Sequence, residues 1–168
     1  MKIKNNPMLG LLLVNLCFSV ISLFMNTFLL AQIFVITGES FLALGLFSIV
    51  NFSFIFIFHV VGSEFCKRFT PIFVIRLSSA LACVILLSVF FLYEQLAYLY
   101  VALGLLWGCV TGLYYCAYQF LLSKNSKNEA MLRYISVYIS MVSILKLGFP
   151  ATFGAIIHYG GFLTTSLM

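Results

Sequence analysis

The chain has 168 residues, of which 64% are hydrophobic and only 8% are charged, and its mean hydropathy is +1.17. This composition excludes a soluble globular domain, in which about 25% of the residues are charged. The net charge of +5 would suggest a nucleic-acid partner for a soluble protein. Here the placement of the basic residues between apolar runs accounts for it, and we expect no nucleic acid among the partners.

Five apolar runs fill almost the whole chain, covering approximately residues 8–35, 41–61, 71–93, 96–123 and 132–159. A hydrocarbon core about 30 Å thick requires ~20 residues at a rise of ~1.5 Å each. Backbone polar groups in lipid must be bonded within the segment. We therefore predict an all-α transmembrane fold, a five-helix multi-pass bundle that forms one domain over residues 1–168 in the lipid bilayer of the cell membrane.

The basic residues predict the orientation of this bundle. Eight of them lie before the first run, near the connection between the second and third runs, and between the fourth and fifth: Lys2, Lys4, Lys67, Arg68, Arg76, Lys124, Lys127 and Arg133. The other two connections carry only Glu39 and Glu94. The positive-inside rule then places the N-terminus and the basic connections in the cytoplasm. Cys66, in the connection over residues 62–70, is expected to be an accessible, reduced thiol.

The first run carries Asn15, Ser19, Ser22 and Asn26 at steps of four, three and four residues, which places them on one helical face. Asn51, near the middle of the second run, is a further candidate for lining a cavity. Such a face either supplies interhelical hydrogen bonds, worth about 0.6 kcal/mol each, or forms one wall of a water-accessible cavity.

The fourth run contains Gly104, Gly108 and Gly112. Glycines four residues apart form a groove that admits another helix closely, and we expect the first or second helix of the same chain to occupy it. Tyr115 and Gln119 continue the glycine face. They are candidate substrate contacts, although tyrosines near a helix end also serve as interfacial anchors.

The fifth run contains Lys146 near its middle. A central lysine costs about 2.5–3.5 kcal/mol, and its side chain is too short to reach the interface. Pro150 removes a backbone donor and is expected to kink the helix, and Gly154 is expected to help it pack. We predict that Ser143 and Lys146 line an aqueous cavity together with the polar face of the first helix.

Several function classes lack the residues that they need. The chain has no Asp and no HExxH motif, and its two histidines fall near opposite membrane faces. It has no glycine-rich phosphate loop, and its five cysteines follow neither disulfide nor zinc spacing. We therefore expect no enzyme activity, no metal and no other cofactor.

Residues 62–71 resemble the loop signature of the major facilitator superfamily, in which a Gly is followed after three residues by Asp-Arg. Gly62 matches the glycine, Lys67 stands in place of the arginine and Arg68 follows, while Cys66 replaces the Asp.

Residues 148–154 are similar to a helix signature of the same superfamily's drug antiporters, with Pro150 and Gly154 in register.

This resemblance implies the N-terminal portion of a secondary transporter, with five of twelve helices and a substrate site at the membrane midplane. It implies transport of an unidentified small molecule, with the chain truncated and inactive alone. Its partner would be either a missing C-terminal half or another membrane protein. The alternative is a small multi-spanning accessory or interaction protein that docks to a membrane complex through the glycine face.

Overall fold

The computed structural model describes residues 7–92, 95–125 and 128–160, and every element in these ranges is helical. The first three helical segments are α1 (Pro7–Leu23), the π-helical segment η1 (Phe24–Leu29) and α2 (Leu30–Ile36). Leu23 and Leu30 keep right-handed helical angles, so the three segments form one continuous helix. They are followed by α3 (Phe41–Arg68), α4 (Pro71–Phe91), α5 (Leu96–Asn125) and α6 (Asn128–Gly160).

Local chemistry sets several of the helix ends. Gly38 and Glu39 take positive φ angles of 70° and 63° after α2, which turns the chain back. The Ser40 side chain then accepts a hydrogen bond from the Ala43 amide at 3.3 Å and caps α3. Pro71 begins α4 at a position where a missing amide hydrogen costs nothing.

Four of the described helical stretches are long and apolar enough to cross a membrane: Leu9–Ile36, Phe41–Arg68, Pro71–Phe91 and Leu96–Lys124. The fifth predicted run falls within α6, whose described apolar part, Tyr134–Pro150, is shorter. The chain is therefore a multi-pass helical membrane protein.

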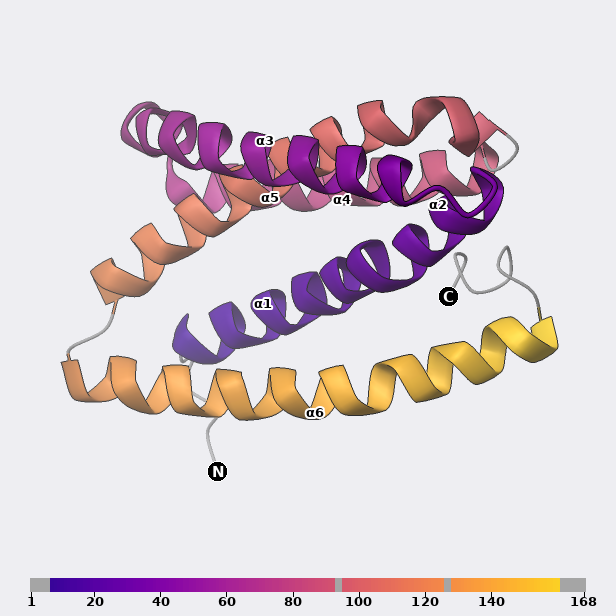
Figure 1. Cartoon of the computed structure of the whole chain (residues 1–168). Coiled ribbons are helices and arrows are strands. Elements are labelled where there is room, and N and C mark those ends of the chain that lie inside the picture. Colours follow the sequence, from indigo (N-terminus) through magenta and orange to yellow (C-terminus); the bar gives the residue numbers. More distant parts are fainter. Residues whose placement is uncertain (1–6, 93–94, 126–127, 161–168) are drawn as a thin grey trace.

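The helices form two groups that meet along α1. Both α3 and α4 pack on α5, whereas α6 lies outermost and runs along α1 (Figure 1). The largest fully buried side chains come from α1, η1, α2, α3, α4 and α5, and include Met25, Phe47, Trp107 and Tyr114. Consequently α1 is covered on both sides, while α6 has one face with no described neighbour.

The glycines of α5 lie directly against the backbone of α3, the second predicted helix. A Cβ atom added at Gly104, Gly108 or Gly112 would approach a carbonyl oxygen of α3 to 3.0, 2.5 and 2.6 Å, respectively. The carbonyls belong to Phe47, Asn51 and Ile55. Since these are also four residues apart, one face of α3 fits the glycine groove turn by turn.

The connection after the second run differs from our expectation. Residues 62–68 are helical and form the last two turns of α3, because no residue before Thr70-Pro71 interrupts the backbone hydrogen bonds. The prediction that Cys66 is accessible is therefore wrong. Cys66 is 5% exposed and points toward α5, where Cys116 also lies next to Gly62.

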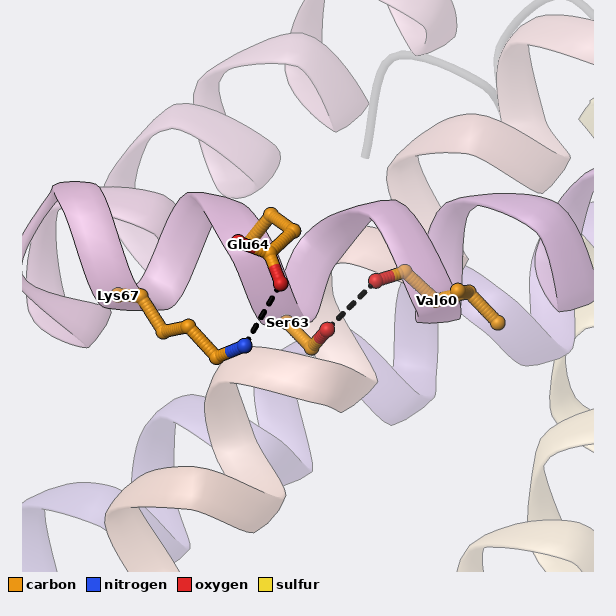
Figure 2. A network of polar contacts seen from close by, with 4 residues as sticks. All are labelled: Val60, Ser63, Glu64 and Lys67. Carbon is orange, nitrogen blue, oxygen red and sulfur yellow. Dashed lines mark hydrogen bonds and ion pairs between the residues drawn. The ribbon is translucent and has the colours of Figure 1, made fainter.

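The charged residues of this segment face outward. Lys67 Nζ lies 2.6 Å from Glu64 Oε1, one turn earlier on α3 (Figure 2). Ser63 donates to the Val60 carbonyl at 2.7 Å, and Arg68 is exposed at the end of the helix.

Candidate functional site

A group of polar and aromatic side chains is buried where α1, α5 and α6 meet. We call it the tyrosine cluster, and it consists of Asn15, Ser19, Tyr114, Tyr118, Tyr134 and Tyr138. Tyr138 is half-buried and the other five are buried. Buried polar residues inside a membrane bundle are uncommon, and they typically mark a ligand pathway or a helix contact.

Hydrogen bonds connect the cluster across the three helices. The Tyr114 hydroxyl donates to Asn15 Oδ1 at 3.4 Å, and the Tyr118 hydroxyl donates to that of Tyr134 at 2.8 Å. The hydroxyls of Ser19 and Tyr138 lie 3.1 Å apart. These contacts tie the polar face of α1 to α5 and to α6.

Aromatic rings enclose the same region. The Phe18 ring of α1 stacks on Tyr114 with ring centroids 3.6 Å apart and planes 5° from parallel. Trp107 stacks on the same phenylalanine at 5.8 Å. Both side chains belong to α5, so a rigid aromatic layer holds α1 against α5.

Four buried polar atoms form no hydrogen bond of good geometry to the described residues. They are Asn15 Nδ2, Asn51 Oδ1, Trp107 Nε1 and Thr111 Oγ1. A buried polar atom without a partner costs about 1–3 kcal/mol. The interior between α1, α3 and α5 therefore retains both donors and acceptors that water or a ligand could use.

The polar face of α1 continues from the buried cluster to the surface. Ser22 is half-buried, and Asn26 is exposed within η1. Asn26 Nδ2 donates to the Ser22 carbonyl at 2.8 Å and lies 3.1 Å from Ser22 Oγ. A π-helical segment shifts the backbone hydrogen bonds by one residue, and such segments occur frequently at functional sites.

The two expected contacts on α5 lie on the same side. Tyr115 is half-buried, and its ring meets Phe18 edge-on at 6.0 Å. Its side chain also interacts with Ser22. Gln119 lies one turn further along and is exposed, so it continues this surface toward the C-terminal end of α5.

Ser143 and Lys146 are both exposed on α6 and lie outside the tyrosine cluster. Tyr138, Val142 and Lys146 are spaced by four residues and share one flank of the helix. Lys146 forms no ion pair with a residue that the structure describes. Lys146 thus lies on the same flank of α6 as Tyr138, a member of the tyrosine cluster. Ser143 lies on the face of α6 that has no described neighbour.

The two helix-packing residues predicted on α6 make no such contact here. Pro150 is exposed, and the helix continues beyond it to Gly160. A Cβ atom at Gly154 would meet no described heavy atom within 4 Å. The packing expected of Gly154 is therefore absent from the described part of the bundle.

The residues that sequence reasoning missed are aromatic. Tyr134 and Tyr138 on α6, like Tyr114 and Tyr118 on α5, are four residues apart and so share a face. That spacing was a usable signal, but tyrosines near a helix end are also typical of the membrane interface.

No cluster of metal-ligating side chains forms among the residues that the structure describes. Searches of family models, curated proteins and solved structures found no match to the chain.

Proposed function

We propose that the chain is part of a secondary transporter that moves a small molecule across the membrane. The observation that carries this proposal is a polar surface that starts inside the bundle and reaches exposed residues of the apolar helices. It runs from the tyrosine cluster to Ser22, Asn26, Tyr115, Gln119 and Lys146.

Lys146 supplies the energetic argument. It lies two residues from the centre of α6 (Asn128–Gly160). In a hydrocarbon core about 30 Å thick centred on this helix, its Cα atom would be ~12 Å from the nearer interface at ~1.5 Å per residue, which is further than a lysine side chain extends. The only acidic residue in the α6 sequence is Glu129, the second residue of the helix and 17 residues before Lys146. A lysine exposed to lipid would cost about 2.5–3.5 kcal/mol. A water-filled pathway removes most of this cost.

The resemblance to facilitator-type transporters supports the same mechanism. In such proteins the substrate binds near the midplane between two helical halves, and access alternates as one half rocks against the other. The open polar surface of this chain would form one wall of that site. A second half, or another membrane protein, would supply the other wall.

One observation favours the alternative, an accessory protein that docks to a membrane complex. Ser136, Ser140 and Ser143 are exposed on α6, and the Cβ positions of Gly148 and Gly154 are open. Small residues of this kind let helices approach closely. The glycine groove of α5 is not available for such docking, because α3 fills it.

Solute accumulation in cells separates these functions. Cells of the native host, which supply any partner half, are compared without the chain and with the wild-type chain or Lys146→Leu, over a broad panel of labelled small solutes. Leu147→Ala is the matched control because Leu147 is exposed on the next position of α6. If the chain is part of a transporter, the cellular level of at least one solute should differ from that in cells without the chain when the wild type or Leu147→Ala is produced. Lys146→Leu should leave that level unchanged. An accessory role predicts unchanged solute levels in all three strains.

A further inference from the structure

A groove lies between the ends of α1, α4 and α5, away from the polar surface. Its volume is about 310 Å³, and every lining residue except Arg76 is apolar. The apolar walls include Leu11 and Val14 of α1, Ile72 of α4 and Leu121 of α5. It exists because α4 packs mainly on α5 and α1 runs along α6, so that α1 and α4 diverge at this end.

Arg76 gives the groove a positive charge. Its side chain is exposed and forms no ion pair with the described residues. Lys124 lies one turn beyond Leu121 on α5 and is also exposed. The nearest acidic residue in sequence, Glu64, belongs to α3 and is paired with Lys67. The charge of Arg76 is therefore available to a ligand.

The basic ends of these helices place the groove in the cytoplasmic leaflet by the positive-inside rule. That leaflet carries the anionic lipids, and basic pockets between transmembrane helices on this side bind anionic headgroups. An acyl chain matches the apolar walls, and a phosphate matches the guanidinium, which can bind two of its oxygens at once.

We propose that this groove binds one anionic phospholipid, with its phosphate on Arg76 and an acyl chain between Val14 and Ile72. The lipid would fill the gap between α1 and α4 that protein side chains leave open. This site does not depend on the transport function.

The test measures which lipid remains bound. The protein is reconstituted in nanodiscs of phosphatidylcholine and phosphatidylglycerol, transferred to mild detergent, and weighed by native mass spectrometry. One basic residue near the membrane surface contributes about 1 kcal/mol to anionic lipid binding, which corresponds to a roughly fivefold preference. Arg76→Gln should lose this preference, and Arg76→Lys should keep most of it.

Two further variants make the result specific. Arg68→Gln removes an exposed basic residue outside the groove and should retain phosphatidylglycerol as the wild type does. Ile72→Phe fills the groove at a 53% exposed position and should reduce binding of both lipids. The proposal is overturned if Arg76→Gln retains as much phosphatidylglycerol as the wild type, or if Arg68→Gln loses as much phosphatidylglycerol as Arg76→Gln does. It is also overturned if Ile72→Phe binds both lipids as the wild type does.

Discussion

Replacing Gly108 by Ala should destabilise the bundle although it adds a single methyl group. The new Cβ atom would lie 2.5 Å from the Asn51 carbonyl oxygen, 2.8 Å from Phe54 Cβ and 3.2 Å from the Ile55 amide nitrogen. Two of these atoms are backbone atoms of α3, which no rotamer change can move. The two helices must therefore separate locally.

Overpacking of this kind costs about 1–3 kcal/mol. Alanine also favours the helix over glycine by about 1 kcal/mol, which offsets part of the loss. Gly45→Ala on α3 is the matched control, because its Cβ atom would meet nothing within 4 Å. Both variants share the helix-propensity gain, so their difference in unfolding free energy isolates the packing cost. Gly104→Ala, whose nearest contact is 3.0 Å, should lose less than Gly108→Ala.

Equilibrium unfolding in mixed detergent micelles measures these differences. We expect Gly108→Ala to be less stable than Gly45→Ala by about 1–3 kcal/mol. Equal stability of the two variants would show that α3 does not occupy the glycine groove, and the packing described here would be wrong.

Three further predictions concern orientation, burial and hydrogen bonding. Lys67→Cys, in a background without native cysteines, should react with an impermeant thiol reagent in inverted vesicles and not in intact cells; the reverse pattern would invert the orientation. Native Cys66 should resist the same reagent until the protein unfolds, and rapid labelling of the folded protein would contradict its burial. Tyr134→Phe removes the acceptor of the Tyr118 hydroxyl and should cost about 0.5–1.5 kcal/mol of unfolding free energy, whereas an unchanged stability would show that this bond contributes nothing.

Much of the helical framework could be predicted because apolar length alone requires a helix in lipid. Three predicted spans, 8–35, 71–93 and 96–123, end within two residues of the described helical stretches, and the second span begins at the same residue as α3. The glycine spacing correctly indicated a close helix contact. The end of α3 was placed too early, since charged residues such as Lys67 and Arg68 mark the interface without ending the helix. Cys66 is buried because α5 packs against it, and the hydropathy of the chain does not predict which helices pack together.

The site was predictable only in part for the same reason. Asn15 and Ser19 face helix partners, which is one of the two roles that their spacing allowed, and those partners are tyrosines from distant positions in the chain. The π-helical segment around Asn26 has no recognisable sequence pattern. Lys146 was recognisable from the cost of placing a lysine in lipid. Its neighbours could not be predicted, because they depend on the rotation of α6 about its own axis relative to α1.

The central claim is that the polar surface at bilayer depth contacts water. Single cysteines at Asn26 and Lys146, in a protein whose five native cysteines are replaced, are compared with Leu106→Cys, which is 49% exposed on the apolar surface of α5. The measurement is the rate of reaction with a small water-soluble thiol reagent in the membrane-embedded protein. Our account predicts fast modification at positions 26 and 146 and slow modification at position 106. Rates at positions 26 and 146 as slow as at position 106 would show a surface covered by lipid or protein, and would contradict the proposed pathway.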